Sequence, residues 1–155
     1  MIKVQSAAFD LGAEYAVFKS NRTDIGGFAF FVGSVRDVSG TADVKALTLE
    51  HYPGMTESAL SDIETEARKR WDLQDVLVIH RFGKLLPGED IVLVITASPH
   101  REAAFEACHF IMDWLKTKAP FWKLEEGTTG KSWVEAKTKD EAAASRWKRP
   151  TPNTD

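Results

Sequence analysis

Two apolar segments joined by a Pro-Gly turn constrain the fold of this chain more than any other feature. Val76–Phe82 ("VLVIHRF") and Ile91–Ala97 ("IVLVITA") have the length and β-branched content of strands, and Leu86–Asp90 ("LPGED") lies between them. Pro-Gly favours a tight reversal of the chain, so the sequence predicts that these strands form an antiparallel hairpin. A hairpin of this kind argues against a purely parallel, doubly wound sheet.

Two long amphipathic helices lie among the strand-like segments. The first is expected over Thr56–Trp71, with Thr56 as its cap, and the second over Ser98–Lys118, with Ser98 as N-cap and Pro120 just beyond its end. Weaker signals predict further strands over Ile2–Val4, Gly27–Val32, Val44–Tyr52 and Ser132–Ala136, and helices over Leu11–Lys19 and Lys139–Trp147. Helices combined with hairpins indicate an α+β fold.

The composition is that of an ordinary globular protein. The 155 residues are 43% hydrophobic and 28% charged, which predicts one domain over residues 1–147 followed by a disordered tail over 148–155. A net charge of −3 argues against a protein that binds duplex nucleic acid, because such proteins carry an excess of Lys and Arg. The N-terminus lacks a secretory pattern and no segment is long enough to span a membrane, so we expect a cytoplasmic protein.

Sulfur and metal chemistry have few candidate ligands in this sequence. The single cysteine, Cys108, excludes an intramolecular disulfide and a cysteine-based zinc site. It belongs to the apolar stripe of the second long helix with no suitably spaced cation, which favours a structural role. The four histidines, at positions 51, 80, 100 and 109, show no metal-binding spacing.

A cluster of lysines surrounds the end of the second long helix, in Leu115–Lys123 ("LKTKAPFWK"). Lys116 and Lys118 fall in the last helical turn, where the helix dipole favours cations, and that alone is enough to explain them. It does not explain Lys123, which follows the Pro120 stop and two large aromatics. A lysine beside apolar rings and other ammonium groups suits proton transfer or amine nucleophilicity.

Three further cations are candidates for binding an anion. His100 and Arg101 occupy the first turn of the second long helix, where free N–H groups favour phosphate. Arg36 follows a predicted strand and Gly33, a common setting for an anion contact. Each also has a simpler explanation as a surface residue, with Arg101 paired to Glu102 and Arg36 to its acidic neighbour.

Four segments together resemble the large, catalytic subunit of molybdopterin synthase. They are "ALTLEHYPGMTE" (46–57), "VIHRFGKLLPGE" (78–89), "SPHREAAFEA" (98–107) and "FIMDWLKTKAPFWK" (110–123), and the similarity extends from Ile2 to Trp147. The resemblance implies an α/β hammerhead fold with a mostly antiparallel sheet. It also implies a sulfurtransferase of molybdenum cofactor biosynthesis that converts cyclic pyranopterin monophosphate to molybdopterin, without a cofactor or metal ion of its own.

The resemblance also implies partners. The sulfur would come from a small ubiquitin-like sulfur-carrier subunit whose C-terminal Gly-Gly bears a thiocarboxylate, and whose tail enters a pocket of the large subunit. Two large subunits would form a homodimer at the core of a heterotetramer. Neither a nucleic acid nor a membrane is implied as a partner.

Residue roles carry over from the family motifs. Lys116 and Lys123 match the catalytic lysines, and the substrate-binding set matches Ser34, Val35, Arg36, His100, Arg101, Leu124 and Glu125. Phe31 and Met112 match apolar positions lining the pocket. Lys131 or Lys137 would contribute only if the pocket crosses the dimer interface.

Without the resemblance, the residues leave other functions open. A non-catalytic module that binds a small phosphorylated ligand, or a partner protein's C-terminal tail, would use the same cations without proton transfer. Schiff-base chemistry at a lysine is a third interpretation, and it predicts an adduct that borohydride traps.

Overall fold

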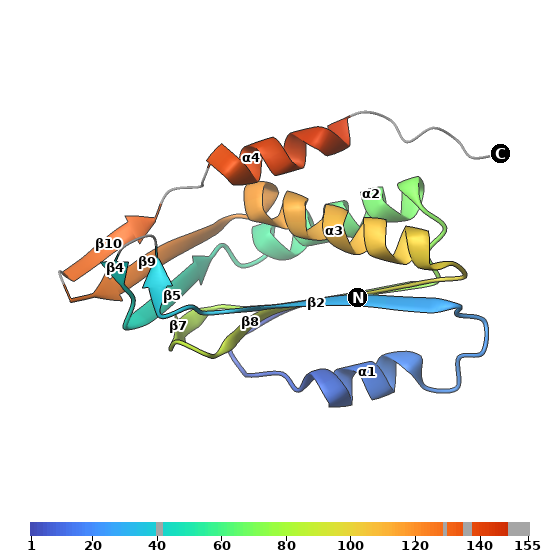
Figure 1. Ribbon diagram of the computed structural model, residues 1–155, viewed down its shortest axis with the longest axis horizontal. Coiled ribbons are helices and arrows are strands. Elements are labelled where there is room, and N and C mark those ends of the chain that lie inside the picture. Colours follow the sequence, from blue (N-terminus) through green and yellow to red (C-terminus); the bar gives the residue numbers. More distant parts are fainter. Residues whose placement is uncertain (40–41, 129, 135–137, 149–155) are drawn as a thin grey trace.

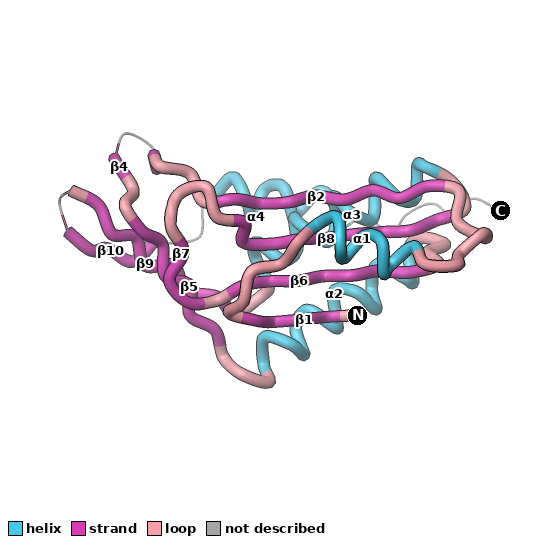
Figure 2. The backbone as a smooth tube through the Cα atoms, turned by 90° about the horizontal axis from the view of Figure 1, so that it is seen from below, coloured by secondary structure: helices cyan, strands magenta, loops and turns pink. Residues whose placement is uncertain are grey.

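A four-stranded sheet forms the centre of the computed structural model, which describes residues 1–39, 42–128, 130–134 and 138–148. Its order is β1 (Ile2–Gln5), β6 (Asp75–Arg81), β8 (Asp90–Ser98), β2 (Gly27–Ser34), as Figure 2 shows. β6 pairs antiparallel with β8 and β8 pairs antiparallel with β2, while β1 joins β6 in parallel. The predicted antiparallel pairing across the Pro-Gly turn is therefore confirmed.

Helices cover both faces of this sheet (Figure 1). α2 (Met55–Arg70) and α3 (Arg101–Lys118) lie on one face and α1 (Leu11–Lys19) lies on the other. Strands β6 and β8 are consequently buried on both sides, which explains why they read as continuous apolar runs rather than as an alternating pattern.

A second sheet lies at one end of the first and has the order β10 (Gly130–Val134), β9 (Phe121–Gly127), β5 (Ala46–His51), β7 (Gly83–Leu85). β7 is a short strand inserted between β6 and β8, so the chain visits the second sheet before the Pro-Gly turn returns it to the first. The small pair β3 (Val38–Ser39) and β4 (Ala42–Asp43), the helix α4 (Thr138–Ser145) and the 3₁₀ helix η1 (Arg146–Lys148) complete the fold. The α+β prediction is confirmed.

The predicted caps of both long helices are wrong. Ser98 ends β8, where its hydroxyl donates to the Asp72 carbonyl at 3.0 Å, and α3 begins only after His100. Thr56 is buried inside the first turn of α2, where its Oγ1 accepts from the Tyr52 N–H at 3.2 Å and donates to the Pro120 carbonyl at 3.4 Å. Thr56 thus connects the start of α2 to the residue that precedes β9.

The predicted disordered tail, apart from Lys148 at the end of η1, lies outside the described residues. Within the described part of the chain, no helix is both long and apolar enough to cross a membrane.

Candidate active site

A cavity of about 600 Å³ lies where the end of β2, the end of α3 and the second sheet meet. Three of the cations singled out in the sequence, Arg36, Lys116 and Lys123, line it together. Phe31, Ser34, Val35 and Glu125 also line it. The fold therefore brings together side chains that are far apart in the sequence, with 94 positions between Phe31 and Glu125.

The Pro-Gly turn holds the segment that carries Arg36. A register shift between Gly33 and Ser34 disrupts the pairing with β8, and the chain then leaves the sheet. The Ser34 hydroxyl donates to Asp90 Oδ1 at 2.6 Å, and the Val35 N–H donates to the Glu89 carbonyl at 2.9 Å. These bonds fix the backbone next to Arg36, so the Arg36 side chain leaves the backbone at a defined position beside the cavity.

The two lysines reach the cavity from different elements. Lys116 lies in the last turn of α3, while Lys123 lies on β9, whose side chains alternate between the two sides of the sheet. Phe121, Lys123 and Glu125 line the cavity, whereas Leu124 does not, as the alternation requires. Lys118 lies over the Trp114 ring at 3.6 Å, which accounts for that lysine without a role in the site.

His100, Arg101 and Met112 do not line this cavity. His100 and Arg101 are exposed at the start of α3, and Lys116 is fifteen residues further along the same helix, a rise of about 22 Å. Met112 is 8% exposed and belongs to the core between the sheet and the helices. A single chain therefore does not unite the two ends of α3 at one site.

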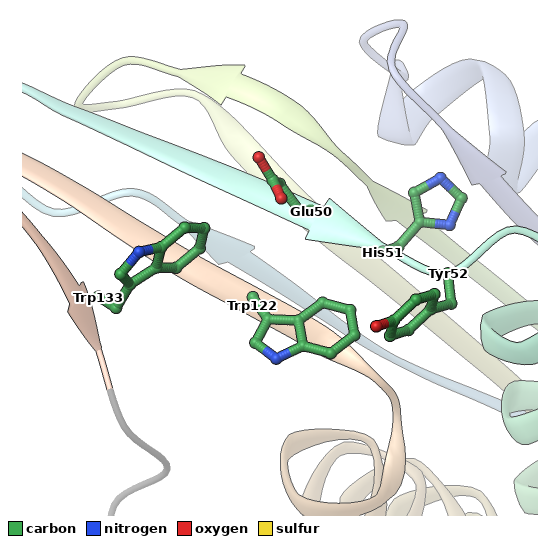
Figure 3. Close-up of a pocket in the computed structure, with 5 residues that line it drawn as sticks. All are labelled: Glu50, His51, Tyr52, Trp122 and Trp133. Atoms are coloured by element: carbon green, nitrogen blue, oxygen red, sulfur yellow. The ribbon is translucent and has the colours of Figure 1, made fainter.

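A shallower pocket of about 340 Å³ lies beside the second sheet (Figure 3). Glu50, Tyr52, Trp122 and Trp133 line it, with the Tyr52 and Trp122 rings 4.4 Å apart at 77°. His51 also lines this pocket and lies at the end of β5, opposite Phe121 in the strand register. Trp122 and Lys123, adjacent in sequence, thus line different pockets.

His80 also lines the larger cavity, and the sequence analysis gave it no role. It is 5% exposed on β6, its Nδ1 lies 2.8 Å from the Arg81 carbonyl oxygen, and its ring stacks on Phe121 at 3.8 Å and 20°. Burial lowers the pKa of His80 to about 4, and the charges of Lys116 and Lys123 act in the same direction. The feature of the sequence that could have indicated His80 is a polar ring directly after the apolar run of β6.

His80 is expected to make the stability of the fold depend on pH. Its pKa is about 4 in the folded chain and 6.5 for an unperturbed side chain, so the unfolded chain binds the proton more readily. This contribution is fully present above pH 6.5 and is lost as the pH falls towards 4, by roughly 3 kcal/mol at most. Urea unfolding of wild type and His80→Gln, between about pH 7 and pH 5, measures it. An equally steep loss of stability in both proteins would contradict the assignment to His80.

Cys108 is buried, and burial raises the pKa of its thiol to about 12. The thiol therefore stays protonated at neutral pH and is not a nucleophile. Among the described residues, no group of three or more His, Cys, Asp and Glu side chains is arranged to hold a metal ion.

The profile of the MoaE protein family matches residues 4–118 of this chain. The chain belongs to the MoaE protein family. A relative from Ralstonia nicotianae, a molybdopterin synthase catalytic subunit, is 55% identical over 152 residues, which cover 98% of this chain and 86% of the relative.

Solved MoaE structures have the same fold as this MoaE chain. The molybdopterin biosynthesis MoaE protein from Burkholderia ambifaria has a TM-score of 0.81 and 49% identity, covering 95% of this chain and 97% of that one. The structure of molybdopterin synthase from Staphylococcus aureus has a TM-score of 0.79 and 26% identity, covering 86% and 96%. The hammerhead architecture implied by the sequence is confirmed by these likenesses.

Proposed function

We propose that this chain is the catalytic subunit of a molybdopterin synthase, acting as a single domain over residues 1–147 in the cytoplasm. It converts cyclic pyranopterin monophosphate to molybdopterin by adding two sulfurs from the thiocarboxylated C-terminus of a small sulfur-carrier subunit. The observation that carries the proposal is the convergence of Arg36, Lys116 and Lys123 on one cavity of a MoaE fold.

The cavity offers the groups that this reaction needs. Arg36 binds the substrate phosphate through charge-assisted hydrogen bonds, helped by the polar edge at Ser34 and Val35. Lys116 and Lys123 donate protons to the oxygens that sulfur replaces and stabilise the negative charge that develops on the oxygen of the carrier's acyl group when that group is attacked. Phe31 gives the cavity an apolar wall and Glu125 lines it from β9, whereas Leu124 faces the other side of that strand and takes no part.

An external sulfur donor agrees with the state of Cys108. Because that thiol is buried and protonated, the sulfur has to arrive on another molecule. A thiocarboxylate at the end of an extended tail fits this need, since a flexible peptide enters a cavity that a folded domain cannot. The ammonium groups of Lys116 and Lys123 attract its negative charge.

A second copy of the chain supplies the missing cations. β2 ends the first sheet as far as the described residues show, and Phe30 and Phe31 on it are 52% and 44% exposed. An exposed apolar edge of this kind calls for a partner. Arg101 packs against the start of β2, because a Cβ added at Gly27 would lie 3.5 Å from the Arg101 Cα, whereas the end of β2 leads to the cavity.

Antiparallel pairing of two β2 strands about a two-fold axis therefore brings the start of β2 in one chain beside the end of β2 in the other. Arg101 of the partner subunit, with His100 of the partner subunit, then lies beside the cavity that holds Arg36. In this arrangement both helix-start cations complete the phosphate site. The homodimer carries one sulfur carrier at each of its two cavities, which gives a heterotetramer. Lys131, ion-paired with Glu126 at 3.6 Å, is not needed, and Lys137 lies outside the described residues.

The fate of the carrier tests the proposal. When this chain and the pterin precursor are mixed with thiocarboxylated carrier, mass spectrometry of the carrier is expected to show loss of sulfur and return of a plain carboxylate. Omitting the pterin precursor should stop the loss. A carrier that keeps its sulfur while the precursor binds would instead favour a non-catalytic binding module.

A further inference from the structure

The cavity contains one titratable ring that the proposed chemistry does not use. His80 belongs to β6, where Val76, Val78 and Ile79 are at most 1% exposed, and it is almost as deeply buried as they are. A buried polar ring lowers stability unless its polar atoms have partners. A histidine at this position of the cavity wall, where an aliphatic residue would continue the pattern of β6, requires an explanation.

Two contacts fix the orientation of the His80 ring. A carbonyl oxygen only accepts hydrogen bonds, so the contact of 2.8 Å to the Arg81 carbonyl requires that Nδ1 carries the proton. The Arg81 backbone is itself fixed, because the Arg81 guanidinium donates to the carbonyls of Ser6 and Asp90. The neutral ring therefore keeps an unprotonated Nε2, which can act as a hydrogen-bond acceptor.

The stack on Phe121 connects His80 to β9. The two rings are nearly parallel, with centroids 3.8 Å apart, and Phe121 is the first residue of the strand. Lys123 follows on the same side of β9, two positions along. The ring is thus packed against the residue that sets the direction in which Lys123 enters the cavity.

Titratable groups on three elements act on the ring. Lys116 on α3, Lys123 on β9 and His51 on β5 all disfavour a proton on His80, and burial does so most strongly. The two lysines line the same cavity as the ring. An uncharged acceptor in the same cavity attracts ammonium groups, whereas an imidazolium would repel them.

We propose that His80 is a positioning residue for the two lysines of the cavity. Its stack on Phe121 sets the start of β9 and with it the place of Lys123, and its Nε2 gives the ammonium groups of the cavity an uncharged acceptor. This role rests on the proposed function, because it concerns the geometry of the same two lysines. It adds a residue that moves no atom of the substrate but aligns the groups that do.

Two substitutions separate the effect of the His80 ring stacked on Phe121 from the effect of Nε2 as a hydrogen-bond acceptor. His80→Phe keeps an aromatic ring against Phe121 and removes the lone pair, so kcat is expected to fall about 10- to 100-fold with KM for the pterin precursor unchanged. His80→Gln restores an amide oxygen near the position of Nε2 but removes the ring from Phe121, so it is expected to recover only part of that loss. The comparison uses the complete heterotetramer, with thiocarboxylated carrier in excess.

His51→Phe is the matched control. His51 lies on β5 with its ring centroid 6.4 Å from that of Phe121, and it does not line the larger cavity. Within the part of the chain that the structure describes, its Nδ1 has no hydrogen-bond partner to lose. It is expected to keep the wild-type kcat. Thermal unfolding of each variant measures stability separately. If His80→Phe does not fold, His80→Leu and His80→Gln, which are similar in size, give the same comparison of acceptor against none.

These experiments distinguish failure of the proposed function from failure of the proposed role of His80. A wild-type chain without turnover would overturn the proposed function and this role with it. Wild-type turnover that His80→Phe matches, or an equal loss in His80→Phe and His51→Phe, would overturn the role of His80 alone. So would a rise in KM at constant kcat, which would indicate a direct substrate contact.

Discussion

Lys116→Ala is expected to lower the single-turnover rate of sulfur transfer by about 10²- to 10⁴-fold, the range that one acid–base group supplies. Lys116 lines the cavity from the last turn of α3, together with Arg36 and Lys123. Removal of its ammonium group leaves the attacked carbonyl and the departing oxygen without their proton donor. The assay mixes thiocarboxylated carrier, pterin precursor and enzyme, and follows sulfur incorporation by rapid quench.

Two substitutions on the same helix serve as controls. Lys118→Ala removes an equal charge two positions away, but Lys118 lies over the Trp114 ring rather than in the cavity. Cys108→Ala removes the only thiol, which is buried. Both variants are expected to keep the rate of sulfur transfer within a few-fold of wild type. A loss of about 1 kcal/mol in folding stability leaves the site folded. Full activity of Lys116→Ala would refute its assignment, and loss of activity in Cys108→Ala would refute the external sulfur source.

A mixed dimer of Lys116→Ala and Arg101→Ala is expected to recover activity that neither parent has. If each cavity combines Lys116 of one chain with Arg101 of the partner subunit, one of the two cavities in the mixed dimer holds both native residues. About half of the wild-type rate should return at limiting precursor. The other cavity lacks both groups and contributes nothing.

Two different affinity tags allow the mixed dimer to be purified after coexpression. Calorimetry with the precursor completes the measurement, since Arg101→Ala alone should weaken precursor binding more than carrier docking. A mixed dimer that has only the mean activity of its two parents would show that Arg101 acts within its own chain or not at all. That result would contradict the pairing of β2 edges.

The central sheet and the two long helices were predictable because their signals are local. Apolar runs around a Pro-Gly turn specify an antiparallel pair, and the three- and four-residue spacing of apolar positions specifies the helices. Four strands were missed for a physical reason, because β3 and β4 have only two residues each and β7 and β9 also lack the expected pattern. β7 has three residues, and β9 ("FWKLEEG") alternates charged side chains toward the cavity, so it lacks the apolar pattern of a strand.

The site was predictable in part. Arg36, Lys116 and Lys123 were selected from their sequence context and from the family resemblance, and the fold brings them to one cavity. Its long-range contacts were not predictable, since no local pattern indicates that His80 stacks on Phe121 across 41 positions. The distance between Arg101 and Lys116 follows from their spacing on one helix. That this distance points to a site shared by two chains could be inferred only from the exposed edge of β2 in the structure.

The most direct test of the central claim is mass spectrometry of the pterin after this chain, the thiocarboxylated carrier and cyclic pyranopterin monophosphate are mixed. The account predicts a product that carries two sulfurs, formed only when the carrier ends in a thiocarboxylate and when Lys116 and Lys123 are both present. An unchanged precursor, recovered after demonstrated binding of both precursor and carrier, would contradict it.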